Sequence, residues 1–229
     1  MSRLVLHRAL GSPPARAVMM LGNILDLKME IRDVNLIKME HKTPQFKKMN
    51  PMGTVPVLED GDFVLSESNA IMKYLLEKYG GEQRERLYPG ELQTRSVVDQ
   101  CLFFAAGVFF PALRAVAGDT LMSNLESPTA KHKADIENSY AIVDAYLQSR
   151  PYIATDRLTI ADLSAGAIAT AMQTMHKVDK DNYPRCTDWI ARLEEEPFFK
   201  TVNKEGVIFF GKLINAFWER NKLKNKQKS

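Results

Sequence analysis

The side chains most able to do chemistry in this sequence lie in two short stretches, Asn50–Leu58 and Glu67–Ile71. In the first, Pro56 opens a short apolar run, so a strand must begin there, because proline cannot donate a hydrogen bond to a neighbouring strand. In the second, Glu67 and Ser68 stand directly before a run with helical spacing, where a helix exposes unpaired backbone N–H groups. A carboxylate and a hydroxyl beside a helix N-terminus and an X-Pro turn could together receive a small zwitterion.

A third candidate is Ser12, which lies in the segment Gly11–Pro14 between an expected strand and an expected helix. The prolines are compatible with a helix start, because the backbone N–H groups of the first turn have no helical partner in any case. The residues alone leave two interpretations open. Ser12 is either a plain N-cap or a hydroxyl that stabilises an anion at the positive end of the helix.

The elements that must position these residues follow from the spacing of apolar side chains. A tight turn at Asp60–Asp62 joins two short strands into a hairpin. The order β-α-β-α-β-β-α within about 80 residues describes a thioredoxin-like domain. The predicted strands cover residues 4–7, 29–36, 57–58 and 63–65, and the predicted helices cover residues 15–25, 43–49 and 68–79.

The pattern changes after Gly80–Gly81. Residues 81–90 are charged and polar, as is typical of a linker, and from Glu91 onward only helical spacing is found, without an internal repeat. Thr159–Asp162 has the form of a capping box, for which we expect a structural role. The predicted fold is therefore α/β plus all-α, with a thioredoxin-like domain at residues 1–80 and an all-helical domain at residues 91–229. Its helices are predicted at residues 97–117, 129–149, 160–175, 183–195, 198–204 and 209–220.

Composition and charge limit the classes of function. The chain has 229 residues, 45% of them hydrophobic, and a formal net charge of +3, which is typical of a soluble globular protein and argues against a nucleic-acid-binding face on the folded part. Much of the positive charge lies in a C-terminal run, for which we expect a frayed solubilising tail, with contact to RNA or acidic lipid as the alternative. The run consists of Arg220, Lys222, Lys224, Lys226 and Lys228.

The cysteines and the hydropathy bear on metal binding and location. Cys101 and Cys186 are far apart and form no Cys-x-x-Cys pair, so neither a metal site nor a disulfide framework is predicted. Cys101 lies in an apolar run, where a buried thiol is the default. No apolar run is expected to span a membrane and no cleavable signal precedes the first strand, so we expect a cytoplasmic protein.

Taken together, these motifs resemble the cytosolic glutathione transferases over essentially the whole chain. The resemblance rests on Ser-Pro-Pro at the first strand-to-helix turn, Asn-Pro-x-x-Thr-Val-Pro at a strand entrance, Glu-Ser at a helix start and Leu158–Asp162 in the helical half. Gly11–Arg16 with Asn35–Leu36 is similar to the insect delta and epsilon classes, and His41 with Gly107–Phe110 favours the epsilon side. The family implies a homodimeric detoxification enzyme that joins the glutathione thiolate to hydrophobic electrophiles, without a metal and with peroxidase or dehydrochlorinase activity as side reactions.

The resemblance also implies roles for particular residues. The thiol of glutathione titrates near pH 8.5, so the enzyme must stabilise the thiolate, and the family assigns this task to Ser12. In the family Pro56 follows a cis bond, which turns the Val55 backbone toward the tripeptide, whereas the residues alone leave cis and trans open. The implied contacts to glutathione are His41, Gly53, Thr54, Val55, Pro56, Glu67, Ser68 and Arg114.

The electrophile pocket is expected between Ser12 and the long helix of the second domain, because hydrophobic ligands are held by apolar concave walls. The competing interpretation is that the same side chains form the core of the bundle, and for Phe103, Phe104 and Phe110 the two are balanced. Met172 and Met175 are expected in the core. The residues expected to line the pocket are Pro14, Phe104, Val108, Phe109, Leu113, Val207, Phe210 and Leu213.

Two positions depart from the family pattern. Gly53 stands where the insect classes usually have a histidine, so that affinity for glutathione could be weaker unless Lys42 substitutes as a point charge. His7 stands where the first strand usually has tyrosine, and we expect it to be structural. These departures keep two alternatives open: a carrier of glutathione or hydrophobic ligands with little turnover, and a regulatory module that has kept only the scaffold.

Overall fold

A computed structural model describes residues 3–227, so Lys228 of the C-terminal basic run lies outside the described residues. The N-terminal half contains one four-stranded sheet with the order β2-β1-β3-β4. Strand β1 pairs in parallel with β2 and antiparallel with β3, and β3 continues into the predicted hairpin with β4. The strands are β1 (Leu4–Arg8), β2 (Met29–Asp33), β3 (Val57–Asp60) and β4 (Phe63–Ser66).

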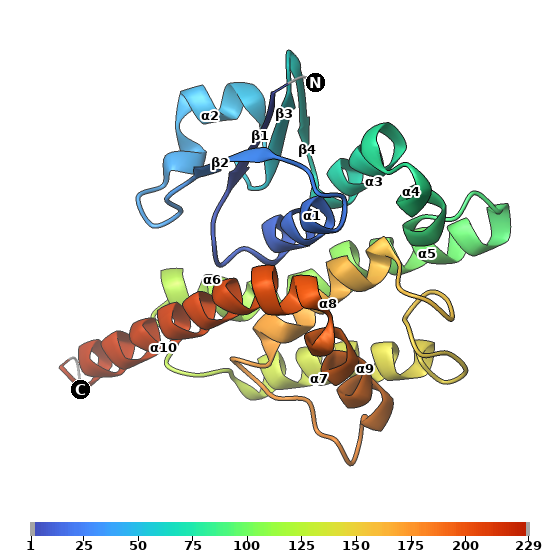
Figure 1. Ribbon diagram of the computed structural model, residues 1–229. Coiled ribbons are helices and arrows are strands. Elements are labelled where there is room, and N and C mark those ends of the chain that lie inside the picture. Colours follow the sequence, from blue (N-terminus) through green and yellow to red (C-terminus); the bar gives the residue numbers. More distant parts are fainter. Residues whose placement is uncertain (1–2, 228–229) are drawn as a thin grey trace.

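Helices cover both faces of this sheet (Figure 1). Helices α1 (Pro13–Ile24) and α3 (Ser68–Tyr79) lie between the sheet and the second half of the molecule. Helix α2 (Pro44–Met49), which follows the short turn η1 (Glu40–Lys42) in the chain, lies on the opposite face. The alternation of side chains along a strand explains the division, because neighbouring residues point to opposite faces. Leu58 packs into the main core, while Val57 packs with Phe46 of α2 in a small second core. This is the predicted thioredoxin-like domain.

The second half is all-helical, as predicted, and is organised around α8 (Ile160–Met172), in which every residue is buried. Met172 and Met175 are in the core, as expected. The other elements of this half are α4 (Glu82–Leu87), α5 (Leu92–Phe104), the π-helical turn η2 (Ala105–Phe109), α6 (Phe110–Met122), α7 (Ala130–Tyr146), α9 (Pro184–Glu195), the π-helical turn η3 (Phe199–Asn203) and α10 (Lys204–Lys226).

The segment at residues 81–90 is more ordered than a polar linker. It contains the helix α4, and Leu87 and Tyr88 at its end are buried in the main core. The charged side chains of α4 serve its exposed face, where Arg84 pairs with Glu77 and Glu85. Charge alone therefore did not distinguish a linker from a short surface helix.

The C-terminal basic run is helical rather than frayed as far as the structure describes it. The two helices predicted at residues 198–204 and 209–220 join through η3 into α10, which continues to Lys226. Asn221 is fully buried, and its amide donates to the carbonyl oxygens of Thr120 (2.9 Å) and Leu125 (2.8 Å). These bonds fix the last turns of α10 against the end of α6 and the segment that follows it, which spacing within α10 could not reveal.

The continuous helical run Leu92–Met122 corrects one sequence expectation. It is long and apolar enough to cross a membrane by length and composition, with a mean hydropathy of 1.8 in its most apolar window. That finding is weak, because 44% of the window is buried inside the protein, and the core helix of a soluble protein passes the same test.

Buried polar groups have structural partners in the places where the sequence predicted them. The carboxylate of Asp162 accepts hydrogen bonds from the backbone N–H groups of Thr159 (2.9 Å) and Ile153 (3.0 Å) and from the indole of Trp189 (3.0 Å). His7 lies within the sheet, where its Nε2 is 2.5 Å from the carboxylate of Glu59. The capping box and the structural role of His7 are thus both consistent with the packing.

Both cysteines are buried free thiols. Burial raises the pKa of Cys101 and of Cys186 to about 12, so neither is a thiolate at neutral pH. Within residues 3–227, no group of three or more His, Cys, Asp or Glu side chains is arranged to hold a metal ion.

Candidate functional site

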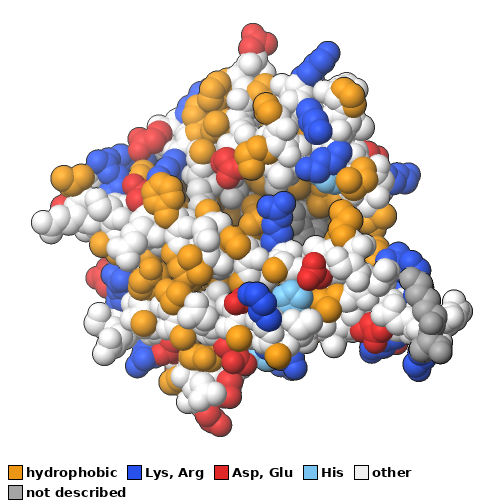
Figure 2. Space-filling view, turned by 180° about the vertical axis from the view of Figure 1, so that it is seen from behind, with side chains coloured by type: hydrophobic (Ala, Val, Ile, Leu, Met, Phe, Trp, Pro, Cys, Tyr) orange, Lys and Arg blue, Asp and Glu red, His pale blue; other side chains and the backbone are white. Residues whose placement is uncertain are grey.

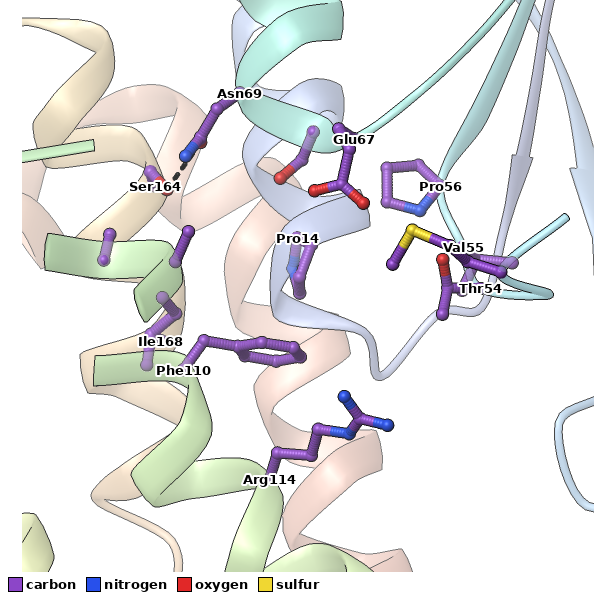
Figure 3. A pocket seen from close by; sticks show the side chains of 14 residues that line it. Pro14, Thr54, Val55, Pro56, Glu67, Asn69, Phe110, Arg114, Ser164 and Ile168 are labelled. Carbon is purple, nitrogen blue, oxygen red and sulfur yellow. Dashed lines mark hydrogen bonds between the residues drawn. The ribbon is translucent and has the colours of Figure 1, made fainter. Parts of the chain in front are cut away.

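A cavity of about 200 Å³ lies where the N-terminal half meets η2, α6 and α8. Figure 2 shows the molecule hollowed between its two halves, with hydrophobic and positively charged side chains along the rim. Figure 3 shows the cavity from close by. Its lining residues are Pro14, Met52, Thr54, Val55, Pro56, Glu67, Ser68, Asn69, Ala105, Ala106, Phe110, Arg114, Ser164 and Ile168.

One wall is the entrance to β3. The Val55–Pro56 peptide bond is cis, as the family resemblance implied. The turn before it is held by the amide of Asn50, which donates to the carbonyl oxygen (2.8 Å) and the hydroxyl (2.9 Å) of Thr54. A fixed turn therefore presents the backbone of Val55 at the cavity. Val55 precedes β3, which begins at Val57, so its N–H and C=O groups are not part of the sheet.

The start of α3 forms the adjoining wall. Glu67 has a positive φ of 71°, a conformation that costs a non-glycine residue about 1–3 kcal/mol and is found most often at functional sites. Its side chain makes no capping hydrogen bond, and Figure 3 shows the carboxylate pointing into the cavity beside Pro56. Ser68 follows at the first position of α3, where backbone N–H groups are unpaired. The carboxylate and these donors are thus available to a ligand.

Arg114 of α6 reaches the cavity from the opposite side, and Figure 3 shows its guanidinium directed toward Thr54 and Pro14. Within the described part of the chain it has no hydrogen bond or ion pair. Arg114 also lines a second, more open cavity of about 370 Å³, which shares Ala106 and Phe110 with the first. An unpaired cation therefore lies where the two cavities meet.

Ser12 lies at the start of α1, half-buried, two residues before the lining residue Pro14. It occupies the N-cap position, but its side chain caps no backbone N–H group. Pro14, the second helical residue, has no N–H to offer, which removes one of the two donors that a capping hydroxyl normally uses. The plain N-cap interpretation is therefore not the one that the geometry favours, and the hydroxyl is free for another partner.

Two predicted glutathione residues, His41 and Gly53, do not line the cavity. Gly53 has a positive φ of 58°, and a Cβ atom there would come 2.6 Å from the carbonyl oxygen of His41. Burial and the charge of Lys42 lower the pKa of His41, whose buried Nδ1 has no partner, so the imidazole is neutral at pH 7. The ammonium of Lys42 donates to the carbonyl oxygens of Met52 (3.1 Å) and Gly53 (2.7 Å), and it therefore ties this loop together.

Most of the predicted electrophile residues lie elsewhere. Phe104, Phe109, Leu113 and Phe210 are buried in the main core, where the rings of Phe104 and Phe109 stack at 5.6 Å, so the packing favours the core interpretation for these four. Val108 is exposed, and Val207 and Leu213 are half-buried on α10, but none of the three lines either cavity. Of the predicted set only Pro14 lines the cavity.

The apolar wall comes instead from η2 and α8, through Ala105, Ala106, Phe110 and Ile168. Pro111 accounts for the π-helical turn, because its ring cannot donate the helical hydrogen bond and crowds the carbonyl one turn earlier. The turn places Phe109 in the core and the neighbouring Phe110 toward the cavity. Phe103, for which the sequence left core and cleft balanced, is in neither and is 74% exposed.

Asn69 is a lining residue that the sequence did not single out. Its side-chain amide donates to the carbonyl oxygen of Leu102 (3.1 Å), and its oxygen accepts from the hydroxyl of Ser164 (2.9 Å), drawn as the dashed line in Figure 3. It joins the start of α3 to α5 and α8. Its position next to Ser68 at a predicted helix start was the available signal. The other lining residues that were not predicted are Met52, Ala105, Ala106, Ser164 and Ile168.

Comparison with known proteins defines the class. Residues 6–83 match the family described as "Glutathione S-transferase, N-terminal domain" and residues 95–197 match "Glutathione S-transferase, C-terminal domain". The chain is 34% identical to Glutathione S-transferase 1 of Manduca sexta over 205 residues, which is 89% of this chain and 93% of that protein.

Solved structures agree with that result. An epsilon-class glutathione S-transferase from the housefly Musca domestica superposes with a TM-score of 0.90 at 33% identity, over 94% of this chain and 98% of that one. A glutathione transferase homologue from Drosophila mojavensis with bound glutathione has a TM-score of 0.89 at 34% identity, over 94% and 98%. The fold and the cleft thus define the class of the protein. It is a transferase whose cleft lies between a thioredoxin-like half and a helical half.

The chain belongs to the glutathione S-transferase family and is a glutathione transferase, for which glutathione is the co-substrate. Nothing in these relatives favours the ligand carrier over the enzyme.

Proposed function

We propose that the cavity between Pro56 and Arg114 binds glutathione and directs its sulfur to Ser12. The observation that carries this proposal is the convergence of six of the eight implied glutathione residues on one cavity, from segments far apart in the sequence. The Drosophila mojavensis relative with bound glutathione supports it. The six are Thr54, Val55, Pro56, Glu67, Ser68 and Arg114.

The charges of the tripeptide fit the groups that face the cavity. Glu67 accepts hydrogen bonds from the ammonium of the γ-glutamyl residue, while the hydroxyl and backbone N–H of Ser68 meet its carboxylate at the N-terminus of α3. The backbone of Val55 pairs with the cysteinyl residue like an added antiparallel strand. Arg114 supplies a cation to the anionic peptide, and we keep His41 and Gly53 as backbone or loop contributors near the glycyl end.

Ser12 then stabilises the thiolate. Its hydroxyl donates a hydrogen bond to the sulfur near the positive end of α1, which favours the charged form and lowers the pKa of the thiol. The thiol proton leaves to solvent. The thiolate sulfur bonds to the electrophilic carbon, and the leaving group, a halide in the case of an aryl halide, departs with the bonding electrons.

The electrophile occupies the apolar end of the cleft. The wall of Pro14, Ala105, Ala106, Phe110 and Ile168 continues into the second cavity past Arg114, which gives a hydrophobic molecule space beside the sulfur. We assign glutathione binding to residues 1–80 and electrophile binding chiefly to residues 91–229, with residues 81–90 between them. Detoxification of hydrophobic electrophiles is the corresponding physiological role.

Replacement of Ser12 by alanine tests the proposal. A hydrogen bond to a charged group contributes about 1.5–3 kcal/mol, so we expect Ser12→Ala to lower kcat for an aryl halide about 10- to 100-fold while the KM for glutathione changes little. The matched control is Ser96→Ala on the exposed face of α5, where the hydroxyl only bonds the carbonyl of Leu92. An unchanged rate for Ser12→Ala would show that another group stabilises the thiolate.

We further propose that the enzyme is a cytoplasmic homodimer. The two free cysteines are compatible with a reducing compartment. Phe103 of α5 is 74% exposed and Leu92 of the same helix is 67% exposed, so α5 presents apolar side chains that a partner can cover. Phe103→Glu should therefore convert the dimer into a monomer in analytical ultracentrifugation, whereas Met122→Glu, equally exposed on α6, should not. A monomeric wild-type enzyme would refute the dimer, and a dimeric Phe103→Glu variant would move the interface elsewhere.

A further inference from the structure

Arg16 in α1 is a fully buried cation without a counter-charge. One terminal nitrogen donates to the carbonyl oxygen of Ala167 (3.0 Å), the other donates to the side-chain and backbone oxygens of Asn203, and Nε has no partner. All these acceptors are neutral, and within residues 3–227 no carboxylate pairs with Arg16. Burial lowers the pKa of the guanidinium to about 9, so it is still charged at neutral pH.

Such a group is not explained by stability. An unpaired buried charge is costly, and a packed apolar side chain of similar size usually gives a protein that is at least as stable. Because the acceptors around Arg16 carry no negative charge, they do not cancel its positive charge. The buried guanidinium therefore creates a local positive potential. The place where that potential acts decides what it can do.

The site proposed for the thiolate lies at the start of the helix that carries Arg16. The backbone N–H of Arg16 donates to the carbonyl oxygen of Ser12 (3.0 Å), which closes the first turn of α1. An anion at a helix N-terminus is normally stabilised by free N–H groups, but Pro13 and Pro14 supply none. The start of α1 is therefore a weak anion site by its backbone alone, and the buried cation carried by the next turn of the same helix compensates for the missing donors.

The cation is held in a fixed position by the helical half. A Cβ atom on Gly206 of α10 would come 2.6 Å from the carbonyl oxygen of Leu10 and would overlap the stem of Arg16, so this contact tolerates only glycine. The amide nitrogen of Asn203 donates to the hydroxyl of Thr170 (3.0 Å), which turns its oxygen toward Arg16. The groups that face Arg16 from α8, η3 and α10 are thus neutral and rigidly placed.

We propose that Arg16 is a positioning residue of the transferase reaction: a buried, uncompensated cation, mounted between α8 and η3, that stabilises the thiolate at the N-terminus of α1 through its field. The inference rests on the proposed site at Ser12. It also gives the helical half a part in thiol activation, because the acceptors of Arg16 belong to that half.

Asn203→Asp tests the field directly, because it places a negative charge beside Arg16 and keeps an oxygen acceptor there. For a unit charge about 10 Å away in a medium of intermediate dielectric constant, we expect the pKa of the enzyme-bound glutathione thiol to rise by about half a unit to one unit. This pKa is read from the thiolate absorbance as a function of pH. At pH 7 kcat should fall about three- to tenfold, and the loss should disappear at high pH, where the thiolate forms without help.

Three further variants separate charge from packing. Arg16→Lys keeps the charge and should keep the thiol pKa near the wild-type value even if it lowers Tm, whereas Arg16→Met should raise it. Gln148→Glu adds the same negative charge at an exposed position after α7 and should change nothing. If Asn203→Asp does not fold, the comparison of Arg16→Lys with Arg16→Met decides the question.

The outcomes also separate this inference from the role of Ser12. If Ser12→Ala raises the thiol pKa but neither Asn203→Asp nor Arg16→Met does, Arg16 is only a packing residue and the proposal is overturned. If the charge variants raise the thiol pKa and Ser12→Ala does not, the field of Arg16 is upheld and the assignment of Ser12 fails.

Discussion

Gly53 is the residue whose replacement should show most directly how the loop before β3 shapes the site. Its φ of +58° costs an alanine about 1 kcal/mol relative to glycine. A Cβ atom there would also lie 2.6 Å from the carbonyl oxygen of His41. Because that oxygen belongs to the backbone, the loop itself has to move, and overpacking of this kind typically costs a further 1–3 kcal/mol or so. We therefore expect Gly53→Ala to lower the free energy of unfolding by about 2–4 kcal/mol.

Gly107 provides a control, because it is exposed, has no positive φ, and a Cβ atom there meets nothing within 4 Å. Gly107→Ala should therefore cost no stability, since alanine is the better residue in a helical turn. For a chain of this size 1 kcal/mol corresponds to a change in Tm of about 2–4 °C, so Gly53→Ala should lower Tm by at least about 4 °C in a thermal melt, whereas Gly107→Ala should not lower it.

The same displacement should weaken glutathione binding. Lys42 holds the carbonyl oxygens of Met52 and Gly53, and Met52 and Thr54 line the cavity, so movement of the loop changes the cavity wall. We expect Gly53→Ala to raise the KM for glutathione with little change in kcat, and Gly53→His, which introduces the residue usual in the insect classes, to bring no gain in affinity. A Tm of Gly53→Ala equal to that of Gly107→Ala, with an unchanged KM, would refute the reasoning.

Two further predictions concern the electrophile wall and the start of α5. Phe110→Ala should raise the KM for a hydrophobic electrophile at a small cost in stability. Phe109→Ala, at a fully buried position, should instead lower the free energy of unfolding by about 3–5 kcal/mol in a denaturant titration. The reverse order of the two stability losses would contradict the assignment of the two rings. Glu91 accepts hydrogen bonds from the backbone N–H groups of Thr94 and Gln93, and these bonds lower the pKa of its carboxyl group. The stability that Glu91 supplies is therefore present above its ordinary pKa and is lost as pH falls through the lowered pKa of the folded state. The difference in Tm between wild type and Glu91→Gln should therefore shrink as pH falls from about 5 to about 3, and a constant difference would exclude this capping role.

The regular elements could be predicted because their side chains repeat with a fixed period. The hairpin of β3 and β4, the helix from Ser68 to Tyr79 and the start of α8 at Ile160 all appear at the residues where turn, cap and apolar signals coincide. The ends of elements were less predictable. Strand β2 stops at Asp33 rather than at residue 36, and α10 passes through the expected break near residue 209, because tertiary contacts rather than local spacing decide these ends.

The electrophile wall could not be predicted from helical spacing, because the spacing changes within it. A π-helical turn adds a residue to one turn of the helix, which rotates everything after it by about 100° relative to what precedes it. A pattern extended from Phe104 through this turn therefore assigns Phe109 and Leu113 to the cleft, whereas both are buried in the core. Pro111 was visible in the sequence as the cause, but a proline inside a helical pattern can also end or kink the helix, and only the packing decides which occurs.

The glutathione side, in contrast, could be located from sequence because its residues sit where regular backbone is interrupted, and interruptions leave signatures. Backbone N–H and C=O groups inside helices and strands are already paired, so a peptide ligand can only be met where that pairing stops. The cis bond at Val55–Pro56, the positive φ of Glu67 and the proline-rich start of α1 are three such points, and each is marked by its residue types. What no local signature reveals is the partner brought from elsewhere. Arg114, Asn69 and the neutral acceptors of Arg16 depend on how the two halves pack, and it is this packing that turns three open backbone points into one site.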